Sequence, residues 1–256
     1  MNIYDIWPAL VSFEKRRLRE TPFLLEQLAA YPEPRILDVA LGSGATTLGL
    51  RLAGVEHIVS NEIDPEYQKV AQQQAASYGI SLTTASYDWK ALGTAYASTF
   101  DVALCLGNSL TLLFEREEQL AVLRSFRDTL RPNGKLIIDQ RNYAGLFLSD
   151  LSGKNYRWSG DVVYCGNDFF SVAPISITPE KVVMEYRRRD TNERVTITMY
   201  PFKQGEVEGL LREAGFAPVS VFGDYKKDFS ADKAEFLTYV AQNCKTINRQ
   251  IIQEAQ

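Results

Sequence analysis

Glycines and acidic side chains stand directly after several apolar runs of this chain, where short loops would expose them to a ligand. Gly42 and Gly44 follow the apolar residues 35–41, and backbone without a Cβ lets a ligand approach closely just before a helix N-terminus. Glu62 lies 18 residues beyond Gly44, at the end of the next apolar run. A carboxylate in that position can accept hydrogen bonds from both hydroxyls of a ribose. The three residues therefore predict a nucleoside site.

Later stretches fit the rest of an adenosine. Ile63 can cover a face of the adenine, and Asp88, after the next apolar run, can accept from the adenine amino group. Residues 104–109 end a further apolar run in a Gly-Asn-Ser turn. Acids at strand ends often cap helices instead, as we expect for Asp64 before a proline. Because these elements all follow apolar runs, together they favour an adenosine ligand.

The glycine loop differs from the two common phosphate-binding loops. A dinucleotide loop reads Gly-x-Gly-x-x-Gly, but Thr47 stands at the third glycine position. The lysine of a triphosphate-binding loop is absent as well. A ligand with an adenosyl group and an amino-acid tail, and without a pyrophosphate, fits this loop better than a dinucleotide or a triphosphate.

The elements that would position these residues alternate between strands and helices. After an N-terminal helical segment at 9–30, strands and helices are expected in turn at residues 35–41, 45–55, 57–63, 65–79, 81–87, 100–108, 116–130 and 135–141. Such alternation predicts an α/β fold with right-handed crossovers and a doubly wound, mostly parallel sheet. Ligands bind outside the carboxyl ends of the strands of such a sheet.

The pattern changes after the last of these strands. Segments without intervening helices predict an antiparallel β insertion at residues 157–164, 169–177, 181–189 and 194–202. A helix at 205–215 and strands at 218–224 and 234–242 then complete the main sheet. We therefore divide the chain into an N-terminal helical lid (1–34), a Rossmann-like domain (35–150 and 203–242), an antiparallel cap over the substrate site (151–202) and a tail without an assigned role (243–256).

The composition argues against several kinds of function. The net charge of −4 disfavours nucleic-acid binding, and the basic clusters at 15–17 and 187–189 are each followed closely by acids. His57 is the only histidine, and the three cysteines lack a zinc-ligand spacing, so we expect no metal site and no disulfide framework. No run approaches the roughly 18 to 20 apolar residues of a membrane span. The N-terminal residues lack the pattern of a targeting signal, and we expect a cytoplasmic protein that is either a monomer or a homo-oligomer.

Short motifs follow the expected strands in a characteristic series, ILDVALGSGATT, NEID, SYDW and LRPNGKLIID. Two more specific motifs are CLGNS at residues 105–109 and IDQRNY at residues 138–143. The series resembles that of class I S-adenosylmethionine-dependent methyltransferases, and within them it is most similar to the glycine N-methyltransferase and glycine/sarcosine methyltransferase group. The similarity extends over most of residues 5–241. It implies a Rossmann-like methyltransferase fold, S-adenosylmethionine as cofactor and S-adenosylhomocysteine as product.

The resemblance also implies roles for particular residues. Arg141 corresponds to the arginine that binds the substrate carboxylate, and Asn108 to the residue that orients the amine. Hydroxyl groups around the acceptor are expected from Tyr4, Tyr156, Tyr186 and Tyr200. The methionine carboxylate of the cofactor is expected at Arg16 or Arg17, and further cofactor contacts at Trp7, Ala40, Gly42, Gly44, Glu62, Ile63, Asp88, Trp89 and Leu106.

Methyl transfer to nitrogen suits a chain with a single histidine. A neutral amine attacks a sulfonium methyl group in line, so positioning supplies much of the acceleration without a dedicated acid or nucleophile. The planar guanidinium of Arg141 binds a carboxylate through two hydrogen bonds. We therefore predict an N-methyltransferase for glycine, sarcosine or a similar small amino acid.

Other interpretations stay open. The same cofactor can serve another small amine or a natural-product hydroxyl. The chain departs from the group at two positions, with Gln140 in place of a frequent histidine and Leu41 in place of a small or polar residue. The sequence therefore predicts the reaction type more firmly than the acceptor. A non-catalytic adenosine-binding module and an NAD-linked oxidoreductase are further alternatives.

Overall fold

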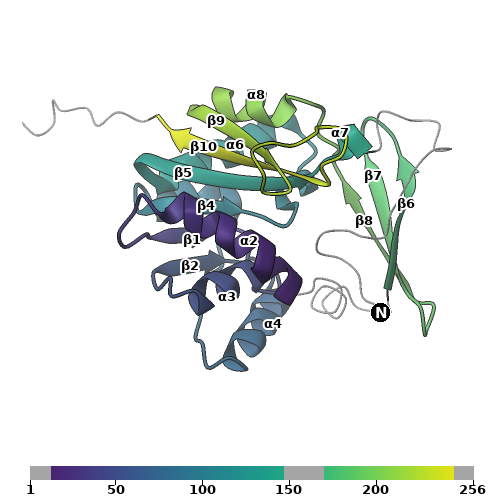
Figure 1. Cartoon of the computed structure of the whole chain (residues 1–256), viewed down its shortest axis with the longest axis horizontal. Helices are drawn as coiled ribbons and strands as arrows, with labels where there is room; N and C mark the ends of the chain where they lie inside the picture. The colour runs from purple at the N-terminus through teal and green to yellow at the C-terminus, as the bar shows by residue number, and fades with distance from the viewer. Residues whose placement is uncertain (1–12, 147–169, 245–256) are drawn as a thin grey trace, which may run out of the picture.

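The structure, a computed structural model, describes residues 13–146 and 170–244 (Figure 1). At its centre is a seven-stranded sheet in the order β3-β2-β1-β4-β5-β10-β9. Its strands are β1 (Ile36–Asp38), β2 (Ile58–Asn61), β3 (Thr83–Ala85), β4 (Phe100–Cys105), β5 (Leu130–Arg141), β9 (Phe216–Gly223) and β10 (Phe236–Asn243). Strands β1 to β5 pair in parallel, whereas β10 is antiparallel to β5 and β9. The predicted doubly wound, mostly parallel sheet is confirmed.

Helices cover both faces of this sheet (Figure 1). They are α2 (Phe13–Leu28), α3 (Ala45–Leu52), α4 (Pro65–Ala76), α5 (Leu92–Ala95), α6 (Arg116–Thr129), α7 (Tyr143–Leu146) and α8 (Glu206–Glu213), with 3₁₀ turns η1 (Trp89–Ala91) and η2 (Ser109–Leu112). Side chains alternate across β4, so that Val102 and Leu104 pack with α2 and α3, while Ala103 and Cys105 pack with α6 and α8. The continuous apolar run of β4 is thus explained by burial on both faces.

The N-terminal segment forms one helix through Pro22 in the described part. Phe23, Leu24 and Leu28 are buried against the sheet, whereas Leu18 in the first half of the helix is 67% exposed. Helix α2 therefore packs mainly through its second half. The first twelve residues of the expected lid lie outside the described residues.

The strands of the parallel half end earlier than their apolar runs. Strand β1 ends at Asp38, yet Val39 and Leu41 are buried as well. Their backbone N–H groups donate to neighbouring segments, Val39 to the Leu104 carbonyl at 2.9 Å and Leu41 to the Asn61 carbonyl at 3.1 Å. The loop that follows β1 is therefore held by hydrogen bonds on both sides.

A separate antiparallel sheet stands beside the main one (Figure 1). It consists of β6 (Phe170–Ile177), β7 (Val182–Arg188) and β8 (Arg194–Met199) in that order. One of its faces packs on Tyr143 of α7 through Tyr186, Met199 and other apolar side chains. The predicted antiparallel insertion is confirmed for these strands, and the strand expected at 157–164 lies outside the described residues. In the described parts of the chain, no helix is long and apolar enough to cross a membrane.

Candidate functional site

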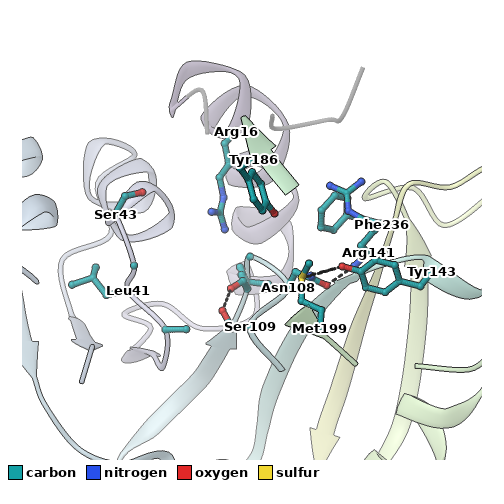
Figure 2. Close-up of a pocket in the computed structure, with 14 residues that line it drawn as sticks. Arg16, Leu41, Ser43, Asn108, Ser109, Arg141, Tyr143, Tyr186, Met199 and Phe236 are labelled. Carbon is teal, nitrogen blue, oxygen red and sulfur yellow. Dashed lines mark hydrogen bonds between the residues drawn. The ribbon is translucent and has the colours of Figure 1, made fainter. Parts of the chain in front are cut away.

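Two pockets open at the carboxyl ends of the parallel strands, on either side of the loop after β1. The larger pocket has a volume of about 470 Å³ and is lined by residues that follow β1, β2 and β3. The smaller pocket has a volume of about 120 Å³ and is shown in Figure 2. Ala40, Gly42 and Ser109 line both pockets. A ligand in one pocket therefore lies next to a ligand in the other.

Glu62 is held in the larger pocket by the loop itself. Its Oε2 accepts a hydrogen bond from the Gly42 N–H at 3.0 Å, and its Oε1 accepts one from the Asp64 N–H at 3.0 Å. Each carboxylate oxygen can accept a second bond. Glu62 is therefore oriented toward the pocket with capacity left for the hydroxyl groups of a ligand.

The two loop glycines have different surroundings. A Cβ on Gly42, which has φ +52°, would meet no protein atom within 4 Å, and Gly42 lines both pockets. A Cβ on Gly44, which has φ +84°, would lie 2.9 Å from the Ala71 Cβ. Gly44 is the N-cap of α3 and is not among the residues that line the two pockets. The absence of a Cβ at Gly44 thus lets α3 pack closely on α4, and its contact with a ligand stays a prediction.

The residues predicted to contact adenine also line the larger pocket. Ile63 is 63% exposed and lines the pocket, as does Asp88. The Asp88 Oδ1 accepts from the Lys90 N–H at 2.8 Å and so caps the turn η1. Trp89 lines the pocket with its ring fixed by a 2.7 Å hydrogen bond from Nε1 to the Val39 carbonyl. Asp88 thus combines the cap that strand-end acids often form with a place in the pocket.

Arg141 lines the smaller pocket at the end of β5 (Figure 2). Only 7% of its surface is exposed, and its Cζ lies 4.9 Å from the centre of the Phe236 ring. Phe236 is opposite Arg141 in the pairing of β10 with β5. The strand pairing therefore fixes the aromatic ring against which the guanidinium rests.

Asn108 occupies the turn after β4 in a left-handed conformation, with φ 67°. Its backbone N–H donates to the Asp139 Oδ1 at 2.8 Å, and its side-chain Oδ1 accepts from the Arg141 N–H at 2.8 Å. Its Nδ2 lies 3.0 Å from the Tyr143 Oη and 3.0 Å from the Met199 Sδ (Figure 2). The side chain of Asn108 thus fixes the backbone of Arg141, and because Asn108 also lines the smaller pocket, its role toward the amine stays a prediction.

The predicted tyrosines have different positions. Tyr186 of β7 is 6% exposed and lines the smaller pocket. Tyr200 does not line either pocket, because its hydroxyl donates to the Glu206 Oε1 at 2.8 Å on the opposite side of the chain from Met199. Burial and Glu206 raise the pKa of Tyr200 to about 12. Met199, the residue before Tyr200, lines the smaller pocket, and the acceptor contact of Tyr200 stays a prediction.

The two arginines of α2 that were predicted to contact the cofactor have different positions. Arg16 lines the smaller pocket, and its Nε donates to the Glu20 Oε2 at 2.7 Å. Arg17 is half-buried, pairs with Glu14 at 2.9 Å and lines neither pocket. The geometry therefore favours Arg16 over Arg17 for the predicted cofactor contact. Tyr4, Trp7 and Tyr156 lie outside the described residues.

The two departures from the expected motifs have separate consequences. Leu41 is 4% exposed and lines the smaller pocket. The Gln140 Nε2 donates to the Tyr239 Oη at 2.9 Å, and Gln140 is not among the residues that line the two pockets. Leu106, which was predicted to contact the cofactor, also lines the smaller pocket. Only the change at Leu41 therefore affects the wall of the site.

Several residues of the site carried no prediction of a role. Tyr143, Met199 and Phe236 line the smaller pocket, and Glu20 binds Arg16 behind it. Tyr143 belongs to the IDQRNY motif, which was a signal that could have found it. Phe236 and Glu20 had no such signal, because their places depend on strand pairing and helix packing.

Two buried aspartates support the loops of the site. Burial raises the pKa of Asp38 to about 6 and that of Asp139 to about 7, and the nearby Arg16 opposes both shifts. Asp38 accepts from the Thr47 Oγ1 at 2.7 Å, which ties the loop after β1 to α3. The Asp139 Oδ2 is buried without a hydrogen-bond partner among the described residues. Burial thus favours the protonated form of both carboxyl groups more than water does.

The histidine and the described cysteines lie away from the two pockets. His57 is exposed just before β2, where its carbonyl accepts from the Ile36 N–H at 2.8 Å. Cys105 is buried in the core and Cys244 is an exposed free thiol. Within residues 13–146 and 170–244, no group of three or more histidine, cysteine, aspartate or glutamate residues is arranged to hold a metal ion.

Comparison with known proteins places this geometry in a family. The family described as "Methyltransferase domain" matches residues 36–134. The chain is 31% identical to a glycine/sarcosine N-methyltransferase of Parasynechococcus marenigrum over 93% of its own length and 82% of that protein. It is 30% identical to a glycine/sarcosine/dimethylglycine N-methyltransferase of Actinopolyspora halophila over 93% of its length, but it spans only 41% of that longer protein.

A solved structure agrees in fold. An S-adenosylmethionine-dependent methyltransferase from Clostridium acetobutylicum superposes with a TM-score of 0.72 at 18% identity, over 95% of this chain and 97% of that one. The larger pocket suits the cofactor of these enzymes, since it combines open backbone at Gly42 with the oriented carboxylate of Glu62. The cofactor is S-adenosylmethionine, and the chain belongs to the family of S-adenosylmethionine-dependent methyltransferases that includes the glycine/sarcosine N-methyltransferases.

Proposed function

We propose that the enzyme methylates the amino group of glycine, sarcosine or a similarly small amino acid. The observation that carries this proposal is the buried guanidinium of Arg141 in a small pocket that shares Ala40 and Gly42 with the larger one. The curated relatives named for glycine and sarcosine support the same acceptor class.

The size and charge of the smaller pocket favour a small acid. Its volume of about 120 Å³ lies below the roughly 300–1,000 Å³ of pockets for drug-sized ligands. Among the described residues that line it, the charged side chains are the cations Arg16 and Arg141. A buried guanidinium favours a carboxylate, which it can bind through two hydrogen bonds. An acceptor with a carboxylate at Arg141 would place its amine toward the loop shared with the larger pocket.

The residues of the larger pocket would hold the adenosyl part of the cofactor. Glu62 would accept from the ribose hydroxyls, Ile63 and Asp88 would bound the adenine, and Gly42 would allow close approach at the loop. Arg16 would bind the carboxylate at the other end of the cofactor. When bound, S-adenosylmethionine supplies a methyl group on a positively charged sulfur.

Proton removal from the amine does not require a base on the protein. The described residues that line the smaller pocket include no histidine, aspartate or glutamate. We propose that the amine enters as its neutral form or loses its proton to water, and that the chain contributes by orienting it. We also propose that the acceptor is a free small molecule and not a nucleic acid, in keeping with the net charge of −4. We further propose that the reaction takes place in the cytoplasm.

A labelled-methyl assay over glycine, sarcosine, dimethylglycine and amines without a carboxylate tests the proposal. We expect transfer to the amino acids. Arg141→Leu should lower their kcat/KM by a factor that corresponds to roughly 2 kcal/mol or more of lost transition-state stabilisation. Arg17→Leu is the matched control, since Arg17 lies outside the pocket. Preferred transfer to an amine without a carboxylate, insensitive to Arg141→Leu, would contradict the amino-acid assignment.

A further inference from the structure

Glu20 is a buried carboxylate on α2, with 1% of its surface exposed. Its Oε2 accepts from the Arg16 Nε at 2.7 Å, and its Oε1 accepts from the Thr46 Oγ1 at 2.7 Å. The Tyr225 hydroxyl donates a longer bond of 3.3 Å to Oε2. Both oxygens are thus bonded, and rotation of the carboxylate would break these contacts.

The three partners come from separate elements around the glycine loop. Thr46 lies in the first turn of α3, directly after the loop, and Tyr225 lies between β9 and β10. Arg16 extends from α2 toward the smaller pocket (Figure 2). Glu20 therefore links the arginine to the start of the helix that follows the loop.

The bond to Nε fixes which edge of the guanidinium is presented to the pocket. A Cβ built on Gly107 would lie 3.7 Å from the Arg16 Nη1 and 3.9 Å from its Nη2. Both terminal nitrogens thus lie beside a residue that lines the smaller pocket. The Nη1 and Nη2 edge can bind a carboxylate while Nε remains bonded to Glu20.

Glu20 also competes with two other acids for Arg16. Asp38 and Asp139 are buried near enough for Arg16 to lower the pKa of each. Without Glu20, the long side chain of Arg16 would be free to turn toward them. A buried ion pair adds little net stability compared with apolar side chains, so its effect is expected mainly in orientation.

We infer that Glu20 is a positioning residue that acts through Arg16 on the amino-acid carboxylate of the cofactor. The inference rests on the proposed place of that carboxylate at Arg16. It assigns Glu20 an effect on one end of the cofactor only. The adenosyl end, held among Glu62, Asp88 and Ile63, should not depend on it.

Two ligands separate these ends. S-adenosylhomocysteine carries the carboxylate, whereas 5′-methylthioadenosine keeps the adenosyl group and lacks it. Calorimetry with Glu20→Leu should give an S-adenosylhomocysteine affinity at least about tenfold weaker, as expected for disturbing a buried charged hydrogen bond, with the 5′-methylthioadenosine affinity unchanged. Glu20→Gln, which can still accept from Nε, should restore most of the loss. Equal weakening of both ligands, or of neither, would overturn the inference.

Three further variants make the test specific. Arg16→Leu should show the same loss, and adding Glu20→Leu to it should cost little more, because both changes remove one interaction. Glu14→Gln changes an exposed acid of the same helix that pairs with Arg17, and it should leave both affinities unchanged. Additive losses in the double variant would contradict action through Arg16.

Thr46→Val serves if Glu20→Leu does not fold, because it removes only one of the bonds to Glu20. It should weaken the affinity for S-adenosylhomocysteine and leave the affinity for 5′-methylthioadenosine unchanged. If the ratio of the two affinities stayed as in the unaltered protein, the inference would be contradicted. The ligand pair decides the role of Glu20, whereas the labelled-methyl assay decides the acceptor. Either proposal can therefore fail without the other.

Discussion

The Asn108 Oδ1 accepts a hydrogen bond from the Arg141 N–H at 2.8 Å, which joins the turn after β4 to the end of β5. The same side chain reaches Tyr143 and Met199 through Nδ2. Arg141 and Asn108 therefore form one unit, in which the turn sets the position of the backbone that carries the guanidinium.

Replacing Asn108 with glycine tests this unit. Glycine tolerates the left-handed conformation but lacks the side-chain amide, so both the Oδ1 acceptor and the Nδ2 donor are lost. We expect kcat/KM for the amino acid to fall by about 1–3 kcal/mol, because the buried groups of Arg141 and Tyr143 lose a partner. Steady-state kinetics with labelled cofactor measure the loss. Unchanged acceptor kinetics would mean that Arg141 does not depend on Asn108.

The two loop glycines should respond differently to alanine. Gly44→Ala should lower the free energy of unfolding by about 1–3 kcal/mol, from backbone strain and the contact with Ala71. Gly42→Ala has room for its Cβ in the protein and should cost about 1–2 kcal/mol from its positive φ. Only Gly42→Ala should directly obstruct the cofactor. Urea unfolding and calorimetry on both variants check this, and weaker cofactor binding by folded Gly44→Ala alone would reverse our assignment.

Two tyrosine-to-phenylalanine changes test whether Tyr186 of β7 or Tyr200 after β8 contacts the acceptor. Tyr186→Phe removes a hydroxyl from the wall of the smaller pocket and should raise the acceptor KM. Tyr200→Phe breaks the bond to Glu206 and should cost about 1 kcal/mol of stability without altering the acceptor KM. Kinetics and thermal unfolding of each protein give the comparison. A raised acceptor KM in Tyr200→Phe would instead support the predicted contact between Tyr200 and the acceptor.

The buried aspartates predict how stability depends on pH. The pKa of Asp139 is about 7 in the fold, whereas an unfolded aspartate has a pKa of about 3.9. The folded state therefore binds more protons between these values, so the free energy of unfolding falls as pH rises from about 4 to about 7. Asp139→Asn cannot titrate and should reduce this slope in urea unfolding.

A control for the pH effect is Asp190→Asn. Asp190 is exposed and its pKa is lowered by the bond to Arg188, which is the opposite direction. Its substitution should leave the slope above about pH 5 unchanged, because above that pH Asp190 is ionised in both the folded and the unfolded state. If Asp139→Asn kept the full slope of the unaltered protein, the titration would belong to another group.

Local signals in the sequence were sufficient for much of the fold and for several residues that line the larger pocket. Gly42, Glu62 and Asp88 each follow a strand that its own apolar run predicts, and parallel strands bring their carboxyl ends to one edge. Arg141 was predicted through its motif at such a strand end. These residues need no information from distant parts of the chain.

The acceptor side could be predicted only in part, because it depends on register and on long-range pairing. Met199 lines the smaller pocket, whereas the hydroxyl of the adjacent Tyr200 binds Glu206. The sequence alone does not show which of these two side chains lines the pocket at the end of β8. Phe236 meets Arg141 only through the pairing of β10 with β5. Glu20 looked like an ordinary acid of an amphipathic helix, and only the packing of α2 on α3 buries it.

The sheet order has a consequence for how the enzyme is made. Strand β10 lies between β5 and β9, although β9 precedes it in the chain. During synthesis, the residues of the cofactor loop leave the ribosome long before Phe236, and β9 has no place beside β5 until β10 has been inserted between them. The residues that line the larger pocket therefore lie mostly in the part of the chain that is made first, whereas the wall of the smaller pocket is complete only when β10 has joined the sheet.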